Sequence, residues 1–447
     1  MPRISGPKAK IVSKITKNIS QLTRCRSPVL FHNLLISAIF IPPLIQNELL
    51  FKPTIMTEQE YNGKRLFWMS CVALITTAMT FAIRARLENV WGGGFDLDAK
   101  AITIAMAPAF WGFTLAQFIG GPLVDLIGMK RFVRIAFFLH AAGIIVTILA
   151  GGFWTLFIGT LLIGVGNGSI EAGCNPLVAT IFPNAKTKML NRFHVWFPGG
   201  IVIGGLASYI IMDELEWSWP ILVGTLIIPL VIYGALMFGQ KFPETERVTM
   251  GVSYGGMWKA IFKPLFLIML FAMLLSAATE LTTGQRITSL LENTGTAPIL
   301  VLVLINGIMA LGRMFAGPIV HRINTTGMLF FSAIVSMIGL LLMSYLTGAA
   351  LTYLSAAVFA IGICFFWPTM LGFVSEKMPE TGALGLSIFG GAGMLSTSIF
   401  LPISGALTDG GATGVEILRY TAILPAVLIV IFAVVFTTMK KSEPKAA

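Results

Sequence analysis

Apolar residues occur in twelve long stretches between residues 66 and 438, separated by short polar segments. Each stretch is long enough to cross a bilayer as a helix, and a helix satisfies its own backbone hydrogen bonds where no water is present. The pattern therefore predicts an all-α polytopic membrane protein with twelve transmembrane helices. Their approximate limits are 66–90, 101–124, 132–150, 153–182, 190–211, 219–240, 263–290, 298–320, 326–347, 349–375, 383–407 and 418–438.

The polar segments between these stretches alternate in charge. Lys and Arg are retained in the cytoplasmic loops of membrane proteins, so we expect the basic segments and both chain termini to be cytoplasmic. We expect a multi-pass protein of the cytoplasmic (inner) membrane. The basic segments carry Lys130, Arg131, Arg134, Lys186, Lys188, Arg192, Lys241, Arg247, Lys259, Lys263, Arg322, Lys440 and Lys441. The acidic segments carry Glu88, Asp96, Asp98, Asp213, Glu214, Glu216, Glu292, Asp409 and Glu416.

The longest internal polar segment, 241–262, lies midway along the spans. It predicts a cytoplasmic linker between an N-terminal six-helix bundle, 56–240, and a C-terminal six-helix bundle, 263–438. A short cytoplasmic tail, 439–447, follows the last span.

The two bundles repeat at a nearly constant offset. Gly121-Pro122 at the end of span two matches Gly317-Pro318 at the end of span eight, and Pro176 in span four matches Pro368 in span ten. Parallel six-helix repeats with a substrate site between them are typical of secondary transporters.

The most informative stretch lies in span four, around Glu171. An ionised carboxylate at mid-membrane depth costs several kcal/mol by most estimates. Asn175 shares the helix face of Glu171, and Pro176 frees a backbone carbonyl one turn earlier. Gly164 and Gly168 leave a smooth face for another helix. We predict a functional site here; the alternative is a protonated Glu171 that only packs against a neighbour.

Composition supports a membrane protein and excludes several other classes. Of the 447 residues, 56% are hydrophobic and only 11% are charged, against about 25% in soluble domains. The net charge of +11 follows from the basic loops, so we expect no nucleic-acid partner. The four cysteines are widely separated and predict neither disulfides nor a metal site. No phosphate-binding Gly-Lys-Ser/Thr loop is present, so no nucleotide cofactor is expected.

Residues 1–55 do not match the rest of the chain. They are basic and then apolar, with Pro42-Pro43 interrupting the apolar part. A signal or transit peptide is one interpretation. The other, which we favour, is that the extension is not translated and that Met56 is the true start.

A loop motif identifies a family. Gly121-Pro122-Leu123-Val124-Asp125-Leu126-Ile127-Gly128-Met129-Lys130-Arg131 resembles the signature of the major facilitator superfamily that follows span two. Gly312-Arg313 with Gly317 resembles its weaker copy in the second half. The resemblance covers about residues 66–438. It implies a transporter of two pseudo-symmetric bundles, without enzymatic activity.

Within this superfamily, the chain resembles the fucose–galactose–hexose:proton symporters. The resemblance rests on Glu171-x-x-x-Asn175-Pro176, on Asn191-x-x-His194-x-x-Phe197, on Ala278-Thr279-Glu280 and on Phe366-Trp367-Pro368. Those symporters carry a functional aspartate in span one, whereas this chain has Arg84 and Arg86 near the corresponding place. The departure leaves the sugar and the proton stoichiometry open.

Burial and resemblance together suggest roles for individual residues. Glu171 and Glu280 are the candidates for proton coupling, and we expect Arg84 to face the centre, with Arg86 at the interface with the headgroups. Arg84 could pair with Glu171, and Arg286 could neutralise Glu280. His140 and His194 are expected to be structural. The candidate substrate-binding residues are Arg84, Gln117, Asn175, Gln285, Asn306 and Trp367. The candidate gating residues are Asp125, Lys130, Arg131 and Arg313.

These features predict a monomeric secondary transporter that moves a monosaccharide with a proton by alternating access. The proton gradient is then the energy source, and the partners are the solute, the proton and the lipid bilayer. Alternatives are an anionic sugar acid or carboxylate as cargo, recruited by Arg84, and a drug or metabolite exporter. A non-transporting nutrient receptor on the same scaffold is an alternative of another class. A membrane enzyme is disfavoured, because no nucleophile with a matched base and no metal-ligand cluster occurs.

Overall fold

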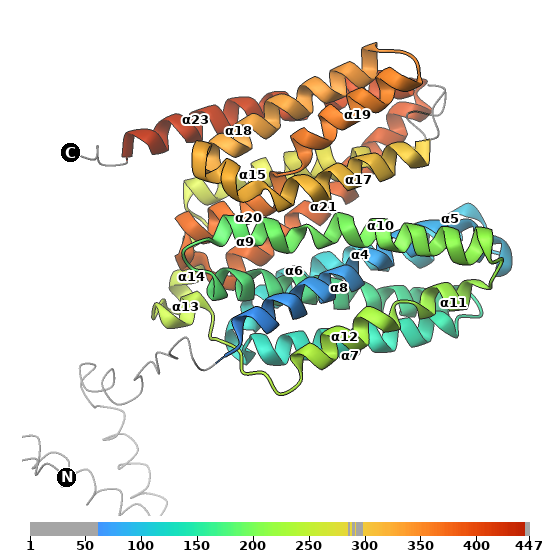
Figure 1. Ribbon diagram of the computed structural model, residues 1–447, viewed down its shortest axis with the longest axis horizontal. Coiled ribbons are helices and arrows are strands. Elements are labelled where there is room, and N and C mark those ends of the chain that lie inside the picture. The colour runs from blue at the N-terminus through green and yellow to red at the C-terminus, as the bar shows by residue number, and fades with distance from the viewer. Residues whose placement is uncertain (1–60, 285–286, 288–290, 292–297, 443–447) are drawn as a thin grey trace, which may run out of the picture. The chain divides into compact units, whose positions relative to one another are not determined.

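A computed structural model describes residues 61–284, 287, 291 and 298–442 (Figure 1). The chain divides into a unit Met1–Ile55 and a unit Met56–Ala447. The first unit, with the predictions made for it, lies outside the described residues. All regular structure described in the second unit is helical, which confirms the predicted fold class.

The N-terminal bundle occupies the chain up to Met237. Its helices are α4 (Gly63–Gly94), α5 (Ala99–Met106), α6 (Pro108–Ile127), α7 (Met129–Ile148), α8 (Phe153–Ile181), α9 (Lys186–His194), α10 (Trp196–Ser208), the π-helix η1 (Tyr209–Glu214), α11 (Trp219–Gly224) and α12 (Ile227–Met237). Two short helices, α13 (Glu246–Thr249) and α14 (Tyr254–Ala260), belong to the linker. We call the end of the molecule that carries them the linker end, and the opposite end the distal end.

The C-terminal bundle begins at Pro264. Its described helices are α15 (Pro264–Ala277), the π-helix η2 (Ala278–Thr282), α17 (Pro298–Met314), α18 (Ala316–Tyr345), α19 (Ala349–Ile363), α20 (Phe366–Lys377), the 3₁₀-helix η3 (Pro379–Thr381), α21 (Gly382–Asp409), α22 (Gly414–Thr421) and α23 (Ile423–Ser442). Figure 1 shows α15 to α23 gathered on one side and α4 to α12 on the other.

Eleven helical segments of the described chain are long and apolar enough to cross a membrane, and Leu300–Met314 is a shorter apolar helix. The shortfall from twelve has a local cause. α18 contains a non-helical residue, Asn324, with φ 56° and ψ 175°. The chain turns there, so α17 and the first part of α18 together form span eight, and the rest of α18 forms span nine.

Prolines set the breaks within two of the spans. A proline lacks the N–H that would bond the carbonyl four residues earlier. α9 ends at His194, which lies four residues before Pro198, and α19 ends at Ile363, next to Cys364, which lies four residues before Pro368. The carbonyl groups of His194 and Cys364 are thereby left without an intrahelical partner.

Glycine allows two close helix contacts around span four and span two. A Cβ atom at Gly164 would lie 2.6 Å from the carbonyl oxygen of Pro108, so α6 and α8 approach backbone to backbone. A Cβ atom at Gly121 would lie 2.9 Å from the Cα of Leu384 in α21. The first contact lies within the N-terminal bundle, as its glycine spacing predicts, and the second joins the two bundles.

Candidate functional site

Polar side chains are buried where α6, α8 and α9 of the N-terminal bundle meet α17, α20 and α21 of the C-terminal bundle. Glu171 lies on α8 and is 1% exposed. Its Oε2 accepts a hydrogen bond of 3.3 Å from Nε2 of Gln117 on α6. The Gln117 amide in turn touches Gly390 of α21. Glu171 is therefore one side chain away from the opposite bundle.

One turn further along α8, Asn175 continues this polar face. Its Oδ1 lies 3.0 Å from Nε2 of His194 on α9, and both residues are buried. His140 also has structural partners, since its ring nitrogens lie 3.1 Å from the Tyr233 hydroxyl and 2.9 Å from Oδ1 of Asn167. Both histidines thus sit in networks inside the N-terminal bundle.

Arg313 joins the two bundles at the end of α17. It is 1% exposed, and each of its three guanidinium nitrogens donates a hydrogen bond. Nε donates to the carbonyl of Cys364 at 2.7 Å, and Nη1 donates to the carbonyl of His194 at 3.1 Å. These are the two carbonyls freed by Pro368 and Pro198. One comes from each bundle, so Arg313 bridges them.

The third nitrogen of Arg313 forms an ion pair with Glu280. Nη2 lies 3.0 Å from Oε1 of Glu280, which sits in the π-helical turn η2. Turns of this kind are frequent at functional sites. Arg313, predicted as a gating residue, is thus buried between the bundles and pairs with Glu280. Arg286 and Gln285 lie outside the described residues.

Several buried polar atoms at this interface have no hydrogen-bond partner in the described structure. They include both donors and acceptors, namely Gln117 Oε1, Asn175 Nδ2, Glu280 Oε2 and Trp367 Nε1. Buried polar atoms in proteins are normally paired. A solute with several hydroxyl groups, each able to donate and accept, would satisfy such a set.

Two further substrate-binding candidates, Trp367 and Asn306, differ in their surroundings. The indole ring of Trp367 packs on Gly393 of α21 and is 6% exposed. Asn306 on α17 donates to the carbonyl of Leu302 in its own helix at 2.9 Å and is 7% exposed. Trp367 is therefore next to the interface helix that also touches Gln117, whereas the described bond of Asn306 is local.

Arg84 does not lie at this interface, contrary to the expected inward orientation. Thr80, one turn earlier on the same face of α4, accepts a hydrogen bond of 2.9 Å from Asn167 of α8. Since α4 and α8 run in opposite directions, Arg84 and Glu171 lie about 12 Å apart along the bundle. No ion pair joins these two described residues. Arg84 instead points into the N-terminal bundle, over the rings of Phe81 and Phe110 at 4.8 and 4.3 Å. Arg86 pairs with Asp213.

At the linker end, Asp125 engages the linker itself. Its Oδ2 lies 2.8 Å from Nε of Arg247, and its Oδ1 accepts a hydrogen bond from Thr245. Arg247 packs on Gly382, the first residue of α21. Lys130 is half-buried and Arg131 is exposed, and neither described side chain is bonded to Asp125. The aspartate of the loop motif therefore ties α6 to the linker, next to the start of α21.

Sequence reasoning did not single out Glu376, which makes a direct polar contact between the bundles at the linker end. Oε1 of Glu376, in the last turn of α20, accepts hydrogen bonds from the backbone N–H and hydroxyl of Thr187 at 3.0 and 2.6 Å. α9 has no capping side chain of its own. Glu376 supplies that cap from the other bundle. A charged residue beside Lys377 at a helix end has no sequence signal that distinguishes it from a solvated residue.

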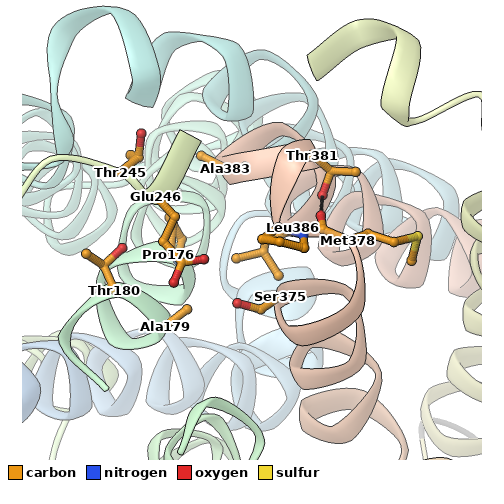
Figure 2. Close-up of a pocket in the computed structure, with 12 residues that line it drawn as sticks. Pro176, Ala179, Thr180, Thr245, Glu246, Ser375, Met378, Thr381, Ala383 and Leu386 are labelled. Atoms are coloured by element: carbon orange, nitrogen blue, oxygen red, sulfur yellow. Dashed lines mark hydrogen bonds between the residues drawn. The ribbon is translucent and has the colours of Figure 1, made fainter. Parts of the chain in front are cut away.

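A pocket lies beside these contacts. Pro176, Ala179 and Thr180 of α8 face Ser375 and Leu386 of the C-terminal bundle, and Glu246 of the linker closes one side (Figure 2). Lys186 reaches Glu246 at 2.8 Å and also the carbonyl of Ser375 at 3.0 Å. The linker end is thus held shut by contacts among both bundles and the linker.

We expect Glu376→Ala to loosen this end. A hydrogen bond to a charged group contributes about 1.5–3 kcal/mol, and each 1.4 kcal/mol is tenfold in an equilibrium. With a Thr180→Cys reporter in a background without other cysteines, the rate of maleimide labelling should rise about tenfold. Glu416→Ala is the control, since Glu416 caps its own helix at Thr413. Equal labelling of the Glu376 variant and its parent would contradict the role of Glu376.

The architecture and the buried polar interface define a membrane transporter. The model of the Major Facilitator Superfamily matches residues 66–385, more than half of the chain. The chain belongs to this superfamily, and the protein is a multi-pass membrane transporter, not an enzyme.

Similar solved structures support this fold. The E. coli fucose:proton symporter FucP matches with a TM-score of 0.69 at 14% identity, over 82% of this chain and 97% of that one. The proton:xylose symporter XylE bound to 6-bromo-6-deoxy-D-glucose matches with a TM-score of 0.66 at 12% identity, over 83% and 95%. At these identities the comparison shows the fold alone.

Curated relatives match over shorter stretches. The lincomycin resistance protein of Streptomyces lincolnensis is 23% identical over 188 residues, which are 40% of this chain and 38% of the relative. The myo-inositol transporter 1 of Saccharomyces cerevisiae is 28% identical over 167 residues, 34% of this chain and 27% of the relative. The matched regions cover well under half of the length of these relatives.

Proposed function

We propose that the protein is a symporter that moves a neutral monosaccharide together with a proton. The observation that carries the proposal is the buried interface between the bundles. It combines a carboxyl group at Glu171, one side chain from the opposite bundle, with unpaired donors and acceptors on Gln117, Asn175, Glu280 and Trp367. A protonatable group beside such a set suits the joint binding of a proton and a polyhydroxylated solute.

A neutral cargo is favoured over a sugar acid by the state of the buried cations. At the described interface, Arg313 already donates to two carbonyls and to Glu280 through its three nitrogens. Arg84, the other candidate for a carboxylate, is turned into the N-terminal bundle. Neither guanidinium is placed to bind an anionic solute between the bundles.

The likeness to FucP and XylE, which are named as sugar symporters, supports the same proposal. We further propose that the linker end is cytoplasmic, in keeping with its basic residues. The closed linker end then corresponds to an outward-facing or occluded state, and rocking of the bundles would break the contacts of Glu376 and Asp125.

The test is uptake of labelled sugars into proteoliposomes with an alkaline interior. We expect a neutral monosaccharide to accumulate, up to about tenfold per pH unit if one proton is coupled. Collapse of the pH gradient should abolish accumulation but leave exchange. Accumulation of glucuronate, with no competition by neutral sugars, would favour the anionic alternative. Binding without flux would indicate a receptor.

A further inference from the structure

A second cavity, with a mostly apolar wall, lies inside the N-terminal bundle, toward the distal end and away from the interface between the bundles. It is lined by residues of α4, α6, α7, α8 and α11, among them Arg84, Trp91, Thr147, Thr160 and Val223. The space between these side chains fits one or two water-sized groups. A sugar does not fit there.

Three polar atoms of the cavity wall have no partner in the described structure. They are Nη1 of Arg84, Nε1 of Trp91 and Oγ1 of Thr147. The three residues are 7%, 2% and 2% exposed. Guanidinium and indole N–H groups only donate, and a hydroxyl is able to donate. The side chains around the cavity therefore include three unpaired groups that are able to donate a hydrogen bond.

The other polar wall groups are already paired. The Thr160 hydroxyl donates to the carbonyl of Ala105 at 2.7 Å. The Thr80 hydroxyl donates to the carbonyl of Thr77 at 2.6 Å and accepts from Asn167. A water molecule in the cavity could accept from the donors, and the side-chain acceptors left for its own hydrogens are the lone pairs of the threonine hydroxyls. An anion has no such hydrogens.

The charge of Arg84 leads to the same conclusion. A buried cation is costly unless it is compensated. The rings of Phe81 and Phe110 compensate it partly through their faces. No ion pair reaches Arg84 in the described part of the chain, and Glu88, one turn further along α4, is exposed. A negative charge in the cavity would complete the compensation.

We propose that this cavity is a binding site for a monatomic anion such as chloride, held by Arg84, Trp91 and Thr147. The anion neutralises the buried guanidinium and ties α4 to α7 in the distal half of the N-terminal bundle. The site is separate from the interface between the bundles, so it acts on the stability of the scaffold, and its occupancy does not depend on the sugar.

The experiment is thermal unfolding of the purified full chain in detergent, titrated with sodium chloride while sodium gluconate holds the ionic strength constant. Gluconate is too large for the cavity. We expect a saturable rise of about 2 °C in Tm at a tenfold excess of chloride over its Kd. Arg84→Met should abolish the rise. Arg86→Met is the matched control, because it removes an arginine that pairs with Asp213 outside the cavity, and it should keep the rise.

If Arg84→Met does not fold, Trp91→Phe keeps the test decisive. It removes one donor while an aromatic ring still packs on Trp219, and it should raise the chloride midpoint about tenfold. Crystals soaked in bromide should show an anomalous peak within hydrogen-bond distance of Arg84. Equal Tm in chloride and gluconate, or the same chloride response in Arg84→Met as in the parent, would overturn the proposal.

Discussion

Glu171→Gln should abolish proton-driven accumulation while leaving passive exchange of the solute. Glutamine keeps the size of the side chain and can still bond to Gln117, but it cannot load and release a proton. One coupled proton gives up to tenfold accumulation per unit of pH gradient, because 1.4 kcal/mol corresponds to a factor of ten. The accumulation ratio of the variant should therefore fall to one. Uptake and counterflow in the same proteoliposomes measure the two activities separately.

Glu214→Gln is the matched control for this experiment. Glu214 is an exposed carboxylate at the distal end, bonded to Tyr209 of the same segment. Its neutralisation should leave accumulation unchanged. If Glu171→Gln still accumulates the solute at the parental ratio, Glu171 is not the coupling group. Loss of accumulation in Glu280→Gln alone would then transfer that role to Glu280.

Arg313→Met is expected to have the largest effect on stability. It leaves the Glu280 carboxylate buried without its ion-pair partner and leaves the carbonyls of His194 and Cys364 unbonded. Removing one partner of a buried ion pair costs about 3–5 kcal/mol. We expect a large fall in Tm, measured by the fluorescence of a dye that reports unfolding in detergent.

Two comparisons separate this effect from a general loss of charge. Arg86→Met removes an arginine from a half-exposed ion pair with Asp213, and such pairs contribute only about 0–1 kcal/mol. The double variant Glu280→Gln with Arg313→Gln removes both charges and should recover part of the lost Tm. A fall no larger than that of Arg86→Met would show that the bridge between the bundles contributes little.

The path of the chain through the membrane was predictable because it depends on local properties. A span is a run of apolar residues whose helix bonds its own backbone, so hydropathy locates it without knowledge of its neighbours. Span four was predicted as 153–182 and is observed as Phe153–Ile181. The burial of Glu171 and the close approach of α6 to α8 at Gly164 were also predicted from the sequence of span four alone. Proline positions also indicate where carbonyls are freed.

The partners of the buried polar groups were not predictable in this way. They depend on how each helix is rotated about its axis and on which helix lies beside it, and both result from packing over many residues. Arg84 turned into its own bundle because the Thr80 face of α4 lies against α8. Arg313 lies at the end of α17, between the carbonyls of Cys364 and His194, which prolines of the two bundles leave free. In this position its third nitrogen also reaches Glu280. The sequence shows which polar groups are present and how far apart they lie along the chain. Only the tertiary structure decides which of these groups pair.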